Sequence, residues 1–246
     1  MRPFVLLALV LALLAAGCDG GGGDGNGGGT TETTTGPSAP TYEDEPAAGK
    51  TVERLVQAAG KTNYATMFNL LTAKSRQRYG PTRETFARGP GRQLAVVLGA
   101  LARAGGSYEP VLAKRMSDWW AVAAVSGSVM RSGQSEYGAY AVPLTREGGE
   151  WRIELAGTVT FNPLTPEAEL RAGSRPNIST EVNASEPILD SAVFVDDTVV
   201  LSTVSPDELL LTADVENPLD KGRHTIVTYA ETQSGAGANA YSFEVG

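Results

Sequence analysis

The chain has few of the side chains that bind metals or form disulfides. Its 246 residues include one cysteine, Cys18, and one histidine, His224. A structural zinc site needs about four Cys or His ligands, and a disulfide within one chain needs two cysteines. The composition therefore excludes both.

Positive charge is also scarce. There are 20 Lys and Arg against 28 Asp and Glu, a formal net charge of -8 at pH 7. Dedicated nucleic-acid binders usually rely on clustered Lys and Arg, so this balance argues against a nucleic-acid partner. Residues 51–173 carry ten acids and fifteen bases, whereas residues 174–246 carry twelve acids and three bases. Such asymmetry suggests separately built units.

Motifs for known chemistries are missing too. The chain contains no Gly-rich phosphate loop, nucleophile elbow, metal triad or Ser/His/Asp set. We therefore expect a protein that is not an enzyme and needs no cofactor.

The first residues read as an export signal. Arg2 provides a positive start, and residues 4–14 form an apolar run shorter than the roughly 20 residues that span a bilayer. Small residues then lead to the lone cysteine in the order Leu14, Ala15, Ala16, Gly17, Cys18.

This LAAGC sequence resembles the lipobox of bacterial lipoproteins. The resemblance implies that residues 1–17 are a signal peptide, that Cys18 is lipidated, and that the protein is held on the extracytoplasmic face of the cell membrane. Two acyl chains give stable anchoring where one gives only marginal binding. The alternative is an ordinary signal peptide with an incidental cysteine.

Residues 18–50 predict a disordered tether. They are rich in Gly, Thr and Pro, and Tyr42 is almost their only bulky apolar side chain. Such a segment cannot bury enough surface to offset its ordering entropy. As a glycine-rich coil it would reach about 30 Å.

Residues 51–170 predict an α+β unit. Apolar residues recur at helical spacing at Val52, Leu55 and Val56, and again over 67–71 and 94–101. Gly60 is expected to separate two helices. A further helix is expected to begin near Thr82, without a capping box because Thr85 stands where Glu is usual. Four strands are expected near 108–116, 119–130, 136–146 and 150–160.

This order, with YGAYAVPLTREGGEWRIEL as its last hairpin, resembles the NTF2-like family. The opening TVERLVQAAGKTNYATMFNLLTAKSRQRYG is similar to the small domain that precedes the transpeptidase in some penicillin-binding proteins. The resemblance implies helices that cover a curved antiparallel sheet, with a cone-shaped pocket between them.

Five aromatic residues are candidates to line that pocket. Trp119 and Trp120 are adjacent, so on a strand they point to opposite faces and one of them should face the cone. With Tyr64, Tyr137 and Tyr140 it could line a site for an apolar or aromatic ligand. The alternative role for these residues is core filling.

The acidic residues of this unit are poor candidates for a catalytic acid or base. Asp118 lies between two expected strands, where a turn residue is usual. The neighbours of Glu109, Glu136 and Glu154 predict that these side chains face solvent.

Residues 175–246 predict a small β-sandwich, because strand-like runs alternate with turn residues and no helical stripe appears. The stretch PLDKGRHTIVTYAETQSGAGANAYSFEV resembles bacterial Ig-like domains.

His224 is expected to have a structural role at the start of a strand. Four aspartates could in principle bind calcium but follow no recognised loop spacing, so we interpret them as turn and edge residues: Asp196, Asp197, Asp214 and Asp220.

Together these features favour a lipid-anchored, non-enzymatic protein that binds a ligand or partner at the cell envelope. Two alternatives remain: an enzyme that uses the NTF2-like pocket, and an accessory or spacer protein of a cell-wall synthesis complex.

Overall fold

The computed structural model describes residues 38–103, 108–131, 134–165, 169–205 and 209–246. The first half of this region contains a five-stranded antiparallel sheet in the order β1-β2-β3-β4-β5. Its strands are β1 (Glu43–Asp44), β2 (Tyr108–Arg115), β3 (Trp120–Arg131), β4 (Gln134–Glu147) and β5 (Glu150–Ile153).

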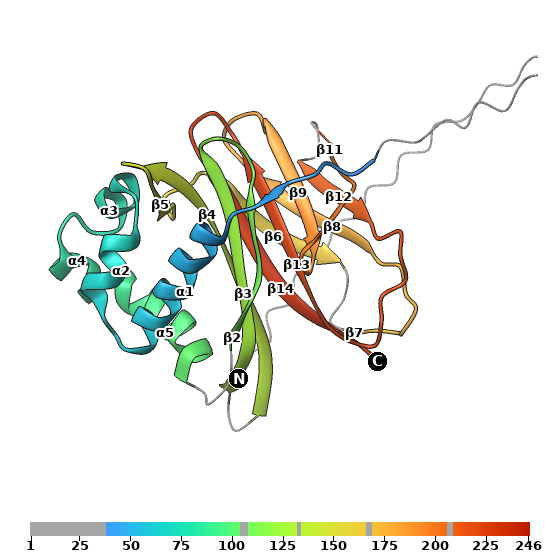
Figure 1. Cartoon of the computed structure of the whole chain (residues 1–246), viewed down its shortest axis with the longest axis horizontal. Coiled ribbons are helices and arrows are strands. Elements are labelled where there is room, and N and C mark those ends of the chain that lie inside the picture. Colours follow the sequence, from blue (N-terminus) through green and yellow to red (C-terminus); the bar gives the residue numbers. More distant parts are fainter. Residues whose placement is uncertain (1–37, 104–107, 132–133, 166–168, 206–208) are drawn as a thin grey trace, which may run out of the picture. The chain divides into compact units, whose positions relative to one another are not determined.

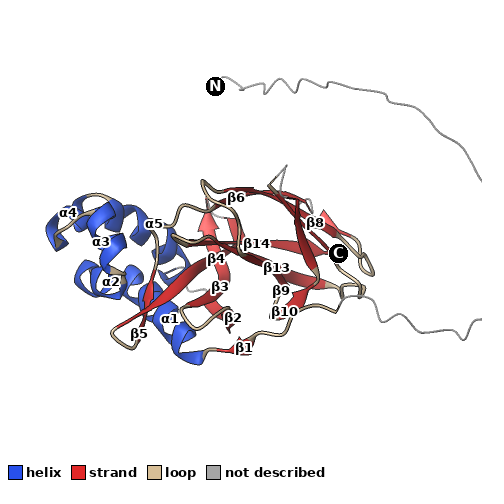
Figure 2. Cartoon of the chain, turned by 90° about the horizontal axis from the view of Figure 1, so that it is seen from above, coloured by secondary structure: helices blue, strands red, loops and turns tan. Residues whose placement is uncertain are grey.

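Five helices lie on one side of this sheet (Figures 1 and 2). They are α1 (Pro46–Gly60), α2 (Tyr64–Leu70), α3 (Ala73–Tyr79), α4 (Arg83–Arg88) and α5 (Pro90–Arg103). The expected apolar stripes are buried, with Val52, Leu55 and Leu98 fully covered. Gly60 ends α1, as the sequence predicted.

The fold begins earlier than residue 51, so the prediction of a disordered tether over 18–50 is wrong for its last part. Strand β1 pairs with β2, and α1 starts at Pro46. Glu45 is only 6% exposed and accepts hydrogen bonds from Arg115. Local composition missed this order because the partner lies 70 residues away.

The start of α4 also differs from expectation. Thr82 and Thr85 do form a capping box, in which each side chain accepts a hydrogen bond from the other residue's backbone amide at 3.2 Å. The hydroxyl of Thr85 takes the place of the usual Glu carboxylate because both groups accept from an amide.

In the described residues of the second half, the regular secondary structure consists of β-strands, without a helix. One sheet has the order β10-β9-β13-β14-β7 and the other β11-β12-β8-β6. The strands are β6 (Thr160–Thr165), β7 (Glu169–Leu170), β8 (Asn177–Asn183), β9 (Asp190–Val195), β10 (Thr198–Val200), β11 (Ser202–Ser205), β12 (Leu210–Asp214), β13 (Gly222–Glu231) and β14 (Ala236–Val245). An apolar core that includes Ile178, Leu211 and Ile226 draws on both sheets.

The boundary between the two halves lies near residues 154–159 rather than near 170. The strand expected over 150–160 ends at Ile153, and β6 begins at Thr160 and pairs with β8 in the second half. The connection between them is buried at Glu154 and at Ala156.

The two halves share an apolar core. Val122, Ala124 and Ala141 of the first sheet pack in one cluster with Phe194 and with others from β9, β13 and β14. The helices therefore cover one face of β3 and the second half covers the other. Burial on both faces accounts for the unbroken AVAAV run over 121–125.

Two glycines allow the connection to run close to β14. A Cβ on Gly157 would lie 2.1 Å from the carbonyl oxygen of Ala236, and one on Gly237 would lie 2.3 Å from the carbonyl oxygen of Val159. No side chain fits at either distance, so the close approach of the connection to β14 depends on these glycines.

Candidate functional site

A groove of about 800 Å³ lies beside the start of β9. Three stretches of chain line it: Pro40 and Tyr42 before β1, residues 184–191 from the end of β8 to the first two residues of β9, and Ser202, Val204 and Leu209 in and after β11. We call it the β9 groove. Its volume is in the range of small-molecule sites, about 300–1,000 Å³.

Tyr42 forms one wall because strand pairing and ring packing hold it there. It directly precedes β1, which pairs with β2. Its ring centroid lies 5.7 Å from that of Phe194 on β9. An aromatic side chain close to the N-terminal end of the described chain is thus fixed against the second half.

Two carboxylates meet at the same end of the sheet. Asp190 begins β9 and Glu231 ends β13, and the two residues are register partners. Partners directly opposite in an antiparallel pair have their side chains on the same face. Tyr229 lies two residues before Glu231. Its hydroxyl group donates a hydrogen bond to Oε2 of Glu231, with 2.5 Å between the two oxygens.

Partial burial disfavours the charged forms of these groups. It raises the pKa of Asp190 above its usual value, although the Ser191 amide opposes the effect. Burial also raises the pKa of Glu231, and the nearby Asp190 charge adds to this, against the hydrogen bond from Tyr229. Burial, Asp190 and Glu231 raise the pKa of Tyr42 to about 12.

No described Lys or Arg forms a salt bridge with Asp190 or Glu231. The carboxylate pair therefore lacks a cationic partner among the described residues, in a half of the chain that is rich in acids. Such a pair favours either a shared proton or an external cation.

The rest of the lining of the β9 groove is mixed. It contains the polar residues Ser185, Glu186 and Ser202 beside apolar ones. Ala184, Ile188 and Val204 pack against the core of the second half and stay partly exposed. Leu189 is 65% exposed. The groove thus combines an apolar wall with a few convergent polar groups, the usual composition of a ligand site.

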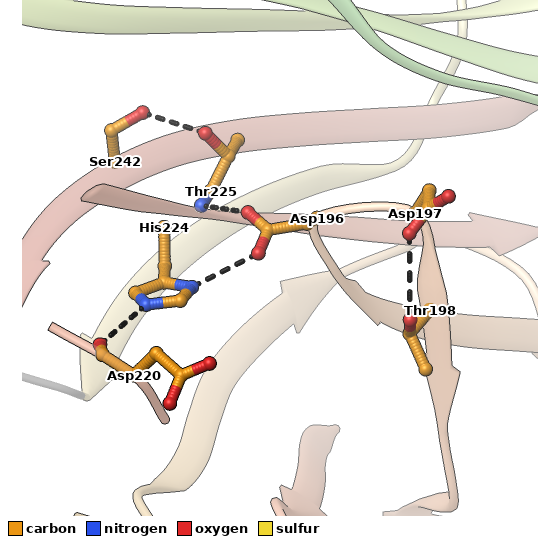
Figure 3. A network of polar contacts seen from close by, with 7 residues as sticks. All are labelled: Asp196, Asp197, Thr198, Asp220, His224, Thr225 and Ser242. Carbon is orange, nitrogen blue, oxygen red and sulfur yellow. Dashed lines mark hydrogen bonds and ion pairs between the residues drawn. The ribbon is translucent and has the colours of Figure 1, made fainter. Parts of the chain in front are cut away.

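His224 lies in a separate polar network (Figure 3). Its Nδ1 is 2.9 Å from Oδ2 of Asp196, and its Nε2 is 3.0 Å from the carbonyl oxygen of Asp220. Oδ1 of Asp196 accepts from the Thr225 amide at 2.9 Å. Both ring nitrogens are engaged, so the geometry agrees with the structural role expected for this histidine.

Asp196 reaches these partners from a left-handed turn. It lies between β9 and β10 with a φ of 56°, a conformation that Asp tolerates better than most residues. Oδ1 of Asp214 instead accepts a hydrogen bond from the side-chain Nδ2 of Asn177 at 2.8 Å. Among the described residues, no group of three or more His, Cys, Asp or Glu is placed to hold a metal ion.

Glu154 does not face solvent, so that prediction is wrong. It is 4% exposed and accepts hydrogen bonds from Thr72, Ser75 and the Ala156 amide at 2.9, 2.8 and 2.6 Å. These contacts tie the start of α3 to the connection between the halves. Glu109 is exposed as expected, and Asp118 lies exposed in the bend before β3.

The five aromatic candidates do not line one pocket. Tyr64 and Tyr140 pack against the core under the helices. Trp120 instead packs into the core shared with the second half, and Trp119 is 67% exposed. Neither tryptophan faces the helices, because β3 begins at Trp120 and its even-numbered residues point away from them.

Tyr137 lies on the same side of the sheet as Trp120, in a different setting. The guanidinium of Arg223 on β13 lies 4.0 Å from the centre of its ring. Its hydroxyl donates to Glu109 at 3.3 Å. Tyr137 therefore joins the two halves at a cavity of about 230 Å³, apart from Tyr64 and Tyr140.

Sequence reasoning missed Asp190 and Glu231. They lie 41 residues apart, and only the pairing of β9 with β13 brings them together. Tyr42 gave a usable signal, because it was almost the only large apolar side chain in the stretch interpreted as tether.

The lipobox residues Leu14, Ala15, Ala16, Gly17 and Cys18 lie outside the described residues. Within the described part of the chain, no helix is both long and apolar enough to span a membrane.

Comparison with known protein families and with curated proteins found nothing that matches this chain.

Proposed function

We propose that this protein is a lipid-anchored, extracytoplasmic binding protein that takes a ligand or partner of the cell envelope into the β9 groove. The observation that carries the proposal is the groove itself, about 800 Å³ with an apolar wall and convergent polar groups. The LAAGC sequence supports the anchor, and the absence of recognisable catalytic motifs supports binding rather than catalysis.

The finer fold assignment belongs to this proposal. Helices on one face of a five-stranded antiparallel sheet fit an NTF2-like unit, and two facing sheets around one core fit an Ig-like unit. The site that we propose is the β9 groove and not the cone that the NTF2-like resemblance suggested. Residues of the second half line most of it, together with Pro40 and Tyr42.

Anchoring would help such a site. A protein tethered at Cys18 meets membrane-proximal ligands at a raised effective concentration, so modest affinity is enough for occupancy. Pro40, about 20 residues after Cys18, is part of the groove lining.

The anchor is tested by Cys18→Ser. We expect the variant to leave the membrane fraction and to lose acyl labelling. A variant that stays membrane-bound without acyl label would contradict the anchor.

The groove is tested by site-specific photo-crosslinking in cells that express the full chain. A photoreactive residue replaces Leu189 in the groove or, as the control, Val97 on α5, since both side chains are well exposed, at 65% and 58%. We expect a product of defined mass from position 189 and not from position 97. Equal products, or none at either position, would exclude the groove as the binding site.

A further inference from the structure

We propose that the β9 groove binds a small molecule that carries a primary ammonium group on an apolar body, with the ammonium between Asp190 and Tyr42. The inference rests on the proposed function of the groove and names its ligand class. Charge complementarity and the chemistry of the walls carry it.

The carboxylate of Asp190 in the groove lining suits a cation. Its Oδ1 accepts from the Ser191 amide at 2.8 Å, which leaves Oδ2 without a hydrogen-bond partner among the described residues. Glu231 on β13 is the register partner of Asp190 and adds a second carboxylate next to the groove lining, and no described Lys or Arg pairs with either. An ammonium group can donate to such oxygens as a charge-assisted hydrogen bond.

Tyr42 adds a second attraction for the same group. Its ring lies in the groove wall and its position is set by the contact with Phe194. The face of an aromatic ring attracts a cation, and a phenol oxygen can accept a further hydrogen bond from it. An anionic ligand would be repelled by both carboxylates.

The aliphatic part of the groove lining suits an apolar body. Ile188, Leu189 and Val204 provide this surface, and the total volume fits a small molecule. Burial of this surface would add to the affinity for a ligand with an apolar body.

The chain's own N-terminal segment is a poor occupant. Residues 19–37 contain Asp19, Asp24 and Glu32, no Lys or Arg, and no large apolar residue. They would bring like charge to the carboxylates and nothing to the apolar wall. The charge of the groove thus favours a ligand from outside the chain.

The test compares three probes of one shape: 4-phenylbutylamine, 4-phenyl-1-butanol and 4-phenylbutyrate. Titration calorimetry would use the full chain with Cys18→Ser, so that no acyl chain competes for the probes. We expect the amine to bind about tenfold or more tightly than the alcohol, since a hydrogen bond to a charged group has this size. The carboxylate should bind least.

The variant Asp190→Asn is expected to bind the amine and the alcohol with affinities within about twofold of each other, because the substitution removes the charge at nearly constant volume. Asp197→Asn, just beyond the other end of β9, is the matched control and should leave the preference unchanged. Leu189→Ser should weaken amine and alcohol alike. If Asp190→Asn does not fold, as judged by thermal melting, Glu231→Gln provides the same comparison.

Failure of this inference can be told apart from failure of the proposed function. Equal binding of amine and alcohol, or a preference that survives Asp190→Asn, overturns the ammonium assignment but leaves the groove as a ligand site. A Lys- and Leu-containing hexapeptide that binds at least about tenfold tighter than the amine, a difference of about 1.4 kcal/mol, overturns the small-molecule assignment. No binding of any probe overturns the inference, and the crosslinking at Leu189 then decides whether the groove is a site at all.

Discussion

His224 and Asp196 form a hydrogen-bonded pair that joins β13 to the turn after β9, with Nδ1 2.9 Å from Oδ2. The other ring nitrogen faces the carbonyl oxygen of Asp220. Both partners are acceptors, so both nitrogens can donate only when the imidazole is protonated. Burial opposes that charge, but these contacts outweigh burial and raise the pKa of His224 above its ordinary value.

This residue is expected to make folding more favourable in mildly acidic than in alkaline solution. A group whose pKa is higher in the folded state adds stability below its unfolded pKa, about 6.5, and loses it as the pH rises through the folded value. We therefore expect the free energy of unfolding of the unmodified chain to fall, relative to His224→Gln, from about pH 6 to about pH 9. Urea titrations at several pH values measure this difference, and a constant difference would contradict the prediction.

Arg115 is expected to matter more for stability than its neighbour Lys114. Arg115 bonds twice to Oε2 of Glu45, which is buried, whereas Lys114 pairs with the exposed Asp44. Removal of one partner from a buried charge leaves the other unsatisfied, while surface pairs contribute little.

The measurement is chemical denaturation of two variants. Arg115→Ala should lower the denaturation midpoint clearly, and Lys114→Ala should leave it close to that of the unmodified chain. Equal effects would show that Glu45 does not depend on its guanidinium partner.

Glu154→Gln is expected to destabilise the protein by about 2 kcal/mol, because an amide keeps only one acceptor oxygen for three donors and adds an amino group beside them. Glu150→Gln is the control, since that side chain is 68% exposed. It should change the free energy of unfolding by less than about 0.5 kcal/mol. Similar losses from both variants would argue against the buried network.

Gly237→Ala is expected to destabilise the protein by about 1–3 kcal/mol, because its Cβ would overlap the Val159 backbone. Gly138→Ala, also within a strand, is the matched control: the nearest atom to its Cβ would be 3.9 Å away. Thermal melting of both variants tests this. An unchanged melting temperature for Gly237→Ala would show that β14 need not approach the connection at Val159 so closely.

Local sequence patterns predicted the positions of the helices. They did not predict which elements pack against each face of the first sheet. The stripe at Val52, Leu55 and Val56 predicted a buried helix face, and the structure confirms it. The run over 121–125 predicted a strand but not that a second sheet covers its far face. Hydrophobic spacing reports that a face is buried, not which distant element buries it.

The polar residues show the same division. Glu109 and Glu154 have similar local surroundings in sequence, yet one is exposed and the other is enclosed by Thr72 and Ser75, about 80 residues earlier. Asp190 and Glu231 likewise become neighbours only because β9 pairs with β13. Burial of a charge is decided by what packs on it, and that is a long-range property.

The sequence by itself determined the helical first part, the strand-rich second part, the lack of a zinc or disulfide framework and the prediction of a lipid anchor at Cys18. These depend on composition and on the spacing of neighbours, which act locally. Only the tertiary structure decided that the two halves share a core, that Tyr42 belongs to the fold, and that the candidate site lies at the β9 groove. Each of these arises from contacts between residues far apart in the chain, which no local pattern encodes.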